Sequence, residues 1–382
     1  MTKNLPEQQS PGQNGRAAGF SLIELMVAMV VFLIVSSASF TLFSRHETLL
    51  SQEQGIAGLN IGLRNALAQL QLDVVNAGNG QIMGANVPAW PVGVTIVNNT
   101  GTGCNPSATS PSTYVASCFD QLNVVNVDPN TPAMHPQTST GGCINTNTGT
   151  TLYGGFSGDI NPSTGSAYTT TQISALAGNF QSGDQILFVS MNTSGTGGKG
   201  YPYTTALLTA NGAYSSLLGG SIQLTFSSTG AGGTNTTAND PISMTVNAPA
   251  TDLTSSFCST DWVLRLLPIE YSVSVATPTD PQLMRQVGHN GTPQVVMDQV
   301  IGMKVGAAWW DNNTSTFAYD YLASDYGSDF TLVRAVRVTL IGRTTPSTDP
   351  LYTYKNPFDQ GHYQIRGSSI IVNPRNLTMN ND

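Results

Sequence analysis

Charged residues are scarce in this chain. Asp, Glu, Lys and Arg together make up 9% of its 382 residues, against roughly 25% in an average soluble domain. This scarcity argues against a disordered polyelectrolyte, a coiled coil and an ordinary cytosolic enzyme. Basic residues are the scarcer kind, and the net charge is −8. We therefore expect no nucleic-acid-binding surface, because phosphate contacts need clustered Lys and Arg. The polarity comes from Gly, Ser, Thr, Asn and Gln, which suits an exported protein.

The shortage of basic residues is greatest in the middle of the chain. Between Asn65 and Leu264 the only basic residue is Lys199. The acidic residues of the same stretch are Asp73, Asp120, Asp128, Asp159, Asp184, Asp240, Asp252 and Asp261. We interpret this acidic zone as a solvated, loop-rich face, with a selected contact surface as the alternative.

Catalytic motifs are also missing. The sequence has no Gly-x-Ser-x-Gly elbow, no P-loop and no HExxH, the local patterns that would indicate a hydrolase, a nucleotide site or a zinc protease. The histidines are scattered, at His46, His135, His289 and His362. We therefore predict that the protein is not an enzyme and needs no cofactor.

One acidic stretch is a candidate metal site. Asp311, Asp320, Asp325 and Asp329 lie in a turn-rich segment that also contains asparagines, and hard cations such as calcium prefer oxygen ligands of this kind. The segment lacks the D-x-[DN]-x-[DN]-G loop with a closing glutamate. An acidic surface loop is the favoured interpretation, and a calcium site is the alternative.

Cysteines are few, and all of them follow the long apolar segment near the N-terminus. They are Cys104, Cys118, Cys143 and Cys258. An even number in an exported domain predicts disulfides, and four cysteines allow three pairings. The favoured pairing joins Cys104 to Cys118 across a short loop and Cys143 to Cys258. A zinc site is disfavoured, because there is no C-x₂-C pair.

The long apolar segment follows a polar stretch of 19 residues. Residues 25–44 carry no charge, which matches the ~20 residues that a helix needs to cross a hydrocarbon core about 30 Å thick. Glu24 stands at the start of this segment. A carboxylate costs about 2.5–3.5 kcal/mol at the bilayer centre and less near the interface. An acid in this place is therefore a candidate functional residue.

Three interpretations of this N-terminus remain open from the residues alone. It could be a plain signal anchor in which Glu24 is incidental. It could be a secretory signal peptide with a small-residue cleavage site at 36–38, just before Ser39. It could also be a leader that is cut before the apolar segment, since Lys3 and Arg16 supply the positive charge typical of a cytoplasmic end.

The third interpretation is supported by a family resemblance. The run Gly19-Phe20-Ser21-Leu22-Ile23-Glu24 resembles the cleavage site of type IV prepilins. The resemblance implies that prepilin peptidase cuts after Gly19 and that the new amine of Phe20 is N-methylated. It also implies that Glu24 neutralises the amine of a neighbouring subunit, because an unpaired charge is expensive in a low-dielectric environment. Major pilins usually carry a proline where this chain has Thr41.

The apolar pattern continues beyond the membrane-length segment with helical spacing. Its residues are Ile56, Leu59, Leu63, Ala66, Leu67, Leu70 and Val74. Because these recur every three or four positions and Gly78 follows them, we predict one helix over about 21–76, on the order of 80 Å long. Three glycines, Gly55, Gly58 and Gly62, indicate either close packing against a sheet or a flexible point.

From about residue 80 onward, short β-rich runs lie between Gly, Pro, Asn and Ser clusters, which predicts an all-β head. The predicted strands are 92–97, 122–127, 185–191, 222–226, 242–246, 262–267, 269–275, 282–287, 303–309, 332–341 and 369–372. Residues 98–181 and 192–240 have weaker strand signals and indicate long loops or an inserted subdomain.

The C-terminal third, including IEYSVSVATPTDPQLMRQV and DFTLVRAVRVTLIGRT, resembles the heads of PilW-type minor pilins. The resemblance implies a pilin-like α+β fold divided into a leader (1–19), a transmembrane or filament-core helix (20–44), an amphipathic helix (45–78) and a head (79–382) with an insertion at about 98–250. It also implies a minor pilin held in the bacterial inner membrane and later displayed on a pilus. The expected partners are prepilin peptidase, other minor pilins, the major pilin and the assembly platform.

Two other functions stay open at this point. One is a J-type minor pseudopilin of a type II secretion system. The other is an adhesive surface pilin that uses the insertion as its binding module.

Replacing Gly19 with a bulky residue should block leader removal, because a side chain at the junction obstructs the peptidase. The variant should run at unprocessed size on a gel and stay in the membrane. N-terminal sequencing of the mature wild-type protein should give methylated Phe20. A mature protein that begins at Ser39, or a Gly19 variant of processed size, would contradict this assignment.

Overall fold

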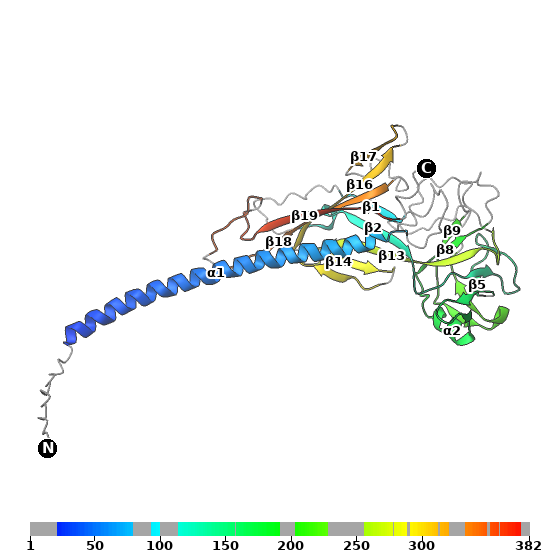
Figure 1. Ribbon diagram of the computed structural model, residues 1–382, viewed down its shortest axis with the longest axis horizontal. Coiled ribbons are helices and arrows are strands. Elements are labelled where there is room, and N and C mark those ends of the chain that lie inside the picture. The colour runs from blue at the N-terminus through cyan, green and yellow to red at the C-terminus, as the bar shows by residue number, and fades with distance from the viewer. Residues whose placement is uncertain are drawn as a thin grey trace, which may run out of the picture. The chain divides into compact units, whose positions relative to one another are not determined.

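The computed structural model describes residues 21–78, 93–99, 114–156, 158–191, 203–227, 256–277, 279–288, 291–311, 314–320, 333–349, 352–358 and 360–375. The chain divides into two compact units. One unit is Met1–Gln54 with Asp349–Tyr352, and the other is Gly55–Thr348 with Thr353–Asp382. Figure 1 shows a long N-terminal helix followed by a head built mainly from antiparallel strands, which confirms the predicted α+β class.

Helix α1 (Leu22–Val75) runs through both units. Within the head unit its buried apolar residues are Leu59, Leu63, Ala66, Leu67, Leu70 and Val74, so the predicted stripe faces the core. Of the predicted set, Ile56 is only partly buried. Gly78 follows the helix with a φ of 72° and donates its N–H to the Val125 carbonyl at 2.8 Å. Glycine suits this left-handed position, which turns the chain away from the helix.

Within the described residues the strands form two main sheets and three smaller ones, and their pairings are antiparallel. The first main sheet has the order β1 (Val94–Val97), β2 (Gln121–Val127), β13 (Trp262–Ser274), β14 (Gln282–Val287) and β15 (Gln294–Met297), with β8 (Gln185–Val189) on β13 and β9 (Tyr203–Leu207) on β8. The second has the order β17 (Thr316–Asp320), β16 (Val300–Asp311), β18 (Val333–Arg343) and β19 (Ile365–Val372).

The smaller sheets and helices lie mostly between β2 and β13 in the sequence. One sheet has the order β10 (Ala213–Ser215), β11 (Ser221–Thr225), β5 (Thr151–Gly155) and β3 (His135–Gln137), and two pairs join β12 (Ser256–Phe257) to β4 (Ile144–Asn145) and β6 (Ile160–Asn161) to β7 (Ser166–Ala167). The short helices are α2 (Thr170–Ala177) and two 3₁₀ turns, η1 (Ala116–Cys118) and η2 (Leu217–Gly219).

The described part of the head has two hydrophobic cores. The first, here named the proximal core, joins the buried stripe of α1 to side chains from β1, β2, β13, β14 and β15 of the first main sheet and from β16, β18 and β19 of the second. The distal core takes side chains from β4, β5, α2, β8, β9, β11 and β12 and from Val263 of β13. Phe188 lies at its centre, with ring centroids 5.5 Å from Phe226 and 5.1 Å from Phe257.

Strand β13 belongs to both cores. The sequence predicts two strands here, at 262–267 and 269–275, whereas the structure has one strand that continues through Pro268. On one edge β13 pairs with β8 up to Leu266 and with β14 from Ile269. Pro268 lies at the change of partner, so its missing N–H removes no ladder hydrogen bond.

The region predicted as long loops or an inserted subdomain forms a distal subdomain in its described part. Its helix α2 was not predicted, although Thr169 and Gln172 carry a sequence signal for it. Gln172 N–H donates to Thr169 Oγ1 at 3.4 Å, and Thr169 N–H donates to Gln172 Oε1 at 2.9 Å. These two bonds are a capping box. Figure 1 shows α2, β5, β8 and β9 beyond the C-terminal end of α1.

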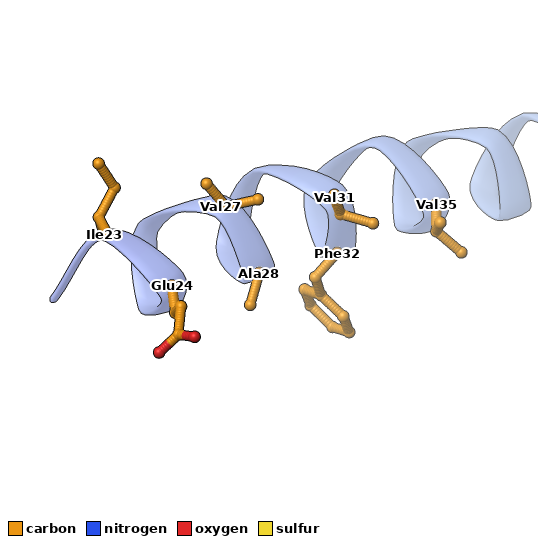
Figure 2. Close-up of a pocket in the computed structure, with 7 residues that line it drawn as sticks. All are labelled: Ile23, Glu24, Val27, Ala28, Val31, Phe32 and Val35. Atoms are coloured by element: carbon orange, nitrogen blue, oxygen red, sulfur yellow. The ribbon is translucent and has the colours of Figure 1, made fainter. Parts of the chain in front are cut away.

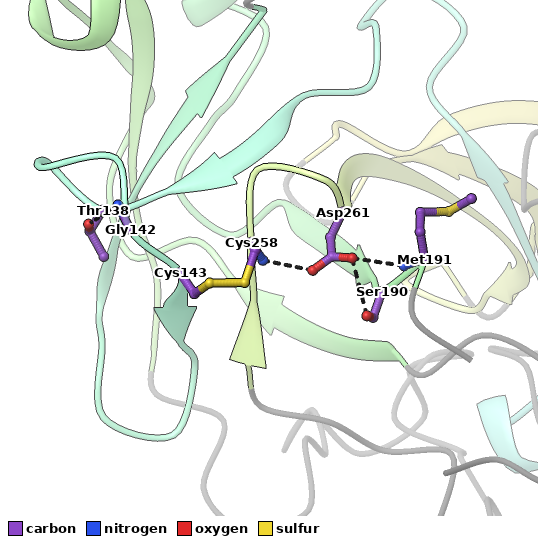
Figure 3. The surroundings of a disulfide bond; sticks show 7 residues. All are labelled: Thr138, Gly142, Cys143, Ser190, Met191, Cys258 and Asp261. Carbon is purple, nitrogen blue, oxygen red and sulfur yellow. Dashed lines mark hydrogen bonds between the residues drawn. A yellow bond between two sulfur atoms is a disulfide. The ribbon is translucent and has the colours of Figure 1, made fainter. Parts of the chain in front are cut away.

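A disulfide joins Cys143, just before β4, to Cys258, just after β12, as Figure 3 shows. The two cysteines are 115 residues apart, and closing so long a loop stabilises the folded state by about 5 kcal/mol in the chain-entropy model. Beside the disulfide, the buried Asp261 carboxylate accepts hydrogen bonds from Cys258 N–H at 2.7 Å and Met191 N–H at 2.8 Å. Ser190 O–H donates to it at 3.1 Å.

The prediction of a solvated acidic face was wrong for most of the acidic zone. Asp73, Asp120, Asp128, Asp184 and Asp261 are each at most 7% exposed. Four of them pair with the first basic residues that follow Leu264 in the sequence. Ion pairs join Arg265 to Asp128 and Asp184, Arg285 to Asp73, and Lys304 to Asp120. The charge asymmetry of the sequence is therefore largely resolved by long-range pairing. Asp240 and Asp252 lie outside the described residues.

The pair of Asp73 and Arg285 fixes the end of α1 to the first main sheet. Arg285 Nε donates to Asp73 Oδ2 at 2.7 Å, and Arg285 Nη2 donates to Asp73 Oδ1 at 3.1 Å. Tyr271 O–H also donates to Asp73 Oδ2 at 2.6 Å. Burial and the neighbouring Asp73 carboxylate raise the pKa of Tyr271, so Tyr271 stays a neutral donor. One helix residue is thereby held by both β13 and β14.

Arg265 of β13 joins two segments that are far apart in the sequence. Its guanidinium pairs with Asp128, just after β2, and with Asp184, just before β8, where Nε donates to Asp184 Oδ2 at 2.9 Å. Burial acts to raise the pKa of Asp128. The hydrogen bonds from Asn130 and Thr131 and the pairing with Arg265 outweigh that effect, so this pKa is lowered.

The variant Arg285→Met should lower the free energy of unfolding by about 3 kcal/mol, because it leaves the buried Asp73 carboxylate without its cation. Arg366→Met on β19 is the matched control, since Arg366 is exposed, and it should change stability by no more than about 0.5 kcal/mol. Denaturant unfolding of the purified protein in detergent measures both. Equal midpoints for the two variants would contradict a stabilising role for this pair.

The head should also lose stability in acid. Since the folded-state pKa of Asp128 is below its ordinary value of 3.8, its contribution is complete above about pH 4 and disappears as the pH falls through the folded-state pKa. Asp128→Asn should be less stable than the wild type at neutral pH and should lose less stability on acidification. Melting temperatures of both proteins at pH 6 and at about pH 3 test this, and parallel declines would refute it.

Candidate assembly site

The N-terminal end of α1 is the candidate site. Gly19 and Phe20, the predicted cleavage and methylation residues, lie outside the described residues. Ser21 immediately precedes the helix, and its backbone N–H donates to Glu24 Oε2 at 3.0 Å. A glutamate in the first turn that accepts the N–H of the preceding cap residue is one half of a capping box, and its charge also favours the positive end of the helix dipole. Glu24 therefore has a partner within its own helix.

This role of Ser21 was missed in the sequence analysis. The signal was present, because Ser followed three residues later by Glu before an apolar run marks a helix start. The sequence predictions assign Glu24 to a contact between subunits or to no role, and do not pair it with Ser21. The two roles are compatible, since a carboxylate has two oxygens and can accept several hydrogen bonds. The Ser21 N–H uses Glu24 Oε2, and Oε1 remains able to accept a further hydrogen bond.

The surface around Glu24 is a shallow apolar notch on one side of α1. Figure 2 shows Glu24, Ala28 and Phe32 projecting toward the same side of the helix, as their spacing of four residues requires. Ile23, Val27, Val31 and Val35 complete the lining. Because Ala28 is small, it leaves space between the carboxylate and the Phe32 ring. The notch can hold an apolar side chain and place a positive group against Glu24.

The first unit presents an almost continuous apolar surface. The following large side chains are each more than half exposed: Leu22, Ile23, Leu25, Met26, Val27, Met29, Val30, Val31, Phe32, Leu33, Ile34, Val35, Phe40, Leu42 and Phe43. They lie all around the helix rather than along one stripe. By length and composition α1 could cross a membrane. A helix that is apolar on every side needs lipid or other protein around it.

Hydroxyl groups within this apolar segment bond to their own helix. Ser39 Oγ donates to the Val35 carbonyl at 2.9 Å, Thr41 Oγ1 to the Ser37 carbonyl at 2.9 Å, and Ser44 Oγ to the Phe40 carbonyl at 3.0 Å. Each bond joins a residue to the carbonyl four positions earlier. These hydroxyls can therefore face lipid without an unsatisfied donor. The helix also continues through Thr41, where major pilins usually have a proline.

The other candidate residues give no second site within the described residues. Groups of His, Cys, Asp and Glu that could hold a metal ion are absent from that part of the chain. Asp311 accepts a hydrogen bond from Thr314 O–H at 2.8 Å, whereas Asp325, Asp329 and the side chain of Asp320 are outside the description. Cys118 is also in a disulfide, and Cys104 lies outside the described residues.

Comparison with known protein families identifies this N-terminal segment. Residues 14–40 match the prokaryotic N-terminal methylation motif, which spans the Gly19–Phe20 junction, Glu24 and most of the apolar segment. The comparisons with curated proteins and with solved structures find no match. The motif supports a pilin or pseudopilin subunit that is processed by prepilin peptidase. Together with the apolar helix it supports membrane anchoring before assembly.

Proposed function

We propose that this protein is a minor pilin that helps to initiate assembly of a type IV pilus and is incorporated at or near its tip. The observation that carries the proposal is the methylation motif, which leads without interruption into a 54-residue helix. One end of this helix is apolar on all sides, and the other is buried in a β-rich head. Such a subunit is suited to storage in a membrane and to later packing against neighbouring helices.

The proposed mechanism has four steps. The apolar segment enters the bacterial inner membrane with the head outside the cytoplasm, and prepilin peptidase removes residues 1–19. The subunit is stored in the bilayer, and the assembly platform then helps to extract it as its helix packs against those of other minor pilins and the major pilin. The notch at Glu24 receives the N-terminal amine of a neighbour. This contact sets the register between the subunits, because the amine loses its water on leaving the headgroup region.

The shape of the head unit supports a terminal position. The distal subdomain extends beyond the C-terminal end of α1. In a filament of parallel helices, the space beyond one helix end is where the next head must fit. A subunit at the tip has no such neighbour. The resemblance of the C-terminal third to PilW-type heads favours the same role.

An adhesive function has support from one observation. The distal subdomain has its own hydrophobic core and its own disulfide, as expected for a module that can bear a binding surface. Intact pili that no longer attach when exposed residues of this subdomain are changed would favour adhesion. A minor pseudopilin of a type II secretion system is the remaining alternative, and the genes beside this one distinguish it.

The variants Glu24→Val and Glu24→Gln should separate the two roles of Glu24. Glutamine retains an oxygen that can accept the Ser21 N–H but has no charge, whereas valine has neither. If the charge is needed for assembly, both variants should be cleaved and inserted normally, and both should be depleted from filaments about tenfold or more, since the neighbouring amine is left unpaired. Glu24→Asp should be intermediate, because the charge remains but its reach is shorter.

The measurement is the ratio of this protein in sheared filaments to that in membranes. Glu53→Gln, in the same helix but beyond the apolar segment, controls for the loss of a charge and should leave the ratio unchanged. A Glu24→Gln variant that assembles as well as the wild type would show that Glu24 acts as a helix cap and not as an assembly contact.

A further inference from the structure

The connection between β18 and β19 contacts the membrane-proximal part of α1. Thr48 O–H lies within hydrogen-bonding distance of Asp349 Oδ2, at 2.9 Å, and both residues belong to the first unit. Thr48 lies four residues beyond Ser44, the last residue of the uncharged segment, which is about 6 Å along the helix axis. If residues 25–44 fill the hydrocarbon core, Thr48 and Asp349 lie at the depth of the lipid headgroups, a layer about 5–8 Å thick on each side.

The same connection then forms a hydrogen-bonded turn around Asn356, which is 0% exposed. Asn356 Oδ1 accepts the Phe358 N–H at 2.9 Å, and its Nδ2 donates to the Gly361 carbonyl at 3.1 Å. Gly361 packs so closely on the buried Tyr363 ring that a Cβ would lie 2.9 Å or less from several of its atoms. Tyr363 is in turn covered by the Arg343 guanidinium, 4.8 Å from the ring centre. The turn is therefore anchored in the head.

This turn exposes an unusual set of side chains. Phe358 is 70% exposed and Tyr354 is 38% exposed, and Lys355 between them is exposed as well. A single exposed apolar residue needs no explanation. Here, however, a buried asparagine and a tightly packed glycine hold the segment in shape while its phenylalanine faces solvent. Aromatic rings beside a lysine are the side chains that settle at a membrane–water interface.

Chain connectivity limits how far Phe358 can lie from Tyr352. Phe358 follows Tyr352, a residue of the first unit, by six positions, and six residues span at most about 20 Å. We propose that residues 352–358, here named the foot, insert Phe358 and Tyr354 into the headgroup layer of the membrane that holds α1. Lys355 would pair with lipid phosphates. This proposal depends on the membrane-anchored stage of the proposed function. The partner that the foot binds is a lipid surface.

Tryptophan fluorescence in vesicles tests the foot. The full-length, leader-processed protein is reconstituted in vesicles of phosphatidylethanolamine and phosphatidylglycerol whose acyl chains are brominated either near the headgroup or near the bilayer centre. The fluorescence that Phe358→Trp adds to that of the wild type should fall by about half with bromines near the headgroup and much less with central bromines, because aromatic residues settle at headgroup depth. This variant changes a residue that is 70% exposed, so the fold should be retained.

Two further variants serve as controls. Tyr319→Trp, at a 68% exposed position on β17, should not be quenched by either lipid. Val31→Trp, within the apolar segment, should be quenched by the central bromines. Quenching of Val31→Trp without quenching of Phe358→Trp would overturn the proposal that the foot inserts into the headgroup layer. It would leave the membrane anchoring of α1 unaffected. Absence of quenching in both overturns the anchored stage together with the foot. Blue-shifted but unquenched emission from Phe358→Trp also overturns it, because that ring would then be buried against protein.

Discussion

The burial of one helix face by two sheets is the constraint on which the head depends. Leu63, Ala66 and Leu70 belong to one hydrophobic core together with side chains of the first and the second main sheet. Residues of α1 and of both main sheets belong to this one cluster of buried side chains, so the helix is part of the core that both sheets share. The soluble half of α1 is therefore a structural part of the head and not a stalk attached to it.

Ion pairs between distant residues also stabilise this arrangement, although the chain has few charged residues. The chain has few ionic groups, and it places many of its acidic ones where they are buried. Asp73, Asp128 and Asp184 each receive a guanidinium from a strand that lies at least 80 residues later in the sequence. A buried carboxylate without its cation would be strongly destabilising, so these pairs favour one register of α1, β2 and β8 against β13 and β14. A chain with many more charged residues would offer more competing pairs.

The sequence predicts the parts of this fold that depend on local periodicity. The helix limits of about 21–76 agree with α1, and β14 coincides with the predicted strand 282–287. The features that the sequence does not predict are those that depend on tertiary contacts. Asp120 and Asp184 were interpreted as solvated because their partners, Lys304 and Arg265, are far away in the sequence. At the site, the motif identified Glu24, but the bond from Ser21 shows that this residue also caps the helix.

The division of the chain into two units explains how such a subunit can change its surroundings. Both hydrophobic cores, the Cys143–Cys258 disulfide and the pairs at Arg265 and Arg285 are complete within the second unit. None of these contacts uses a side chain from residues 22–44. The apolar segment, whose hydroxyls bond to their own backbone, needs from its surroundings only an apolar environment and a partner for Glu24. Lipid supplies the apolar environment, and neighbouring helices can supply both that environment and a partner for Glu24. The apolar segment can therefore leave the bilayer for a filament without any unfolding of the head.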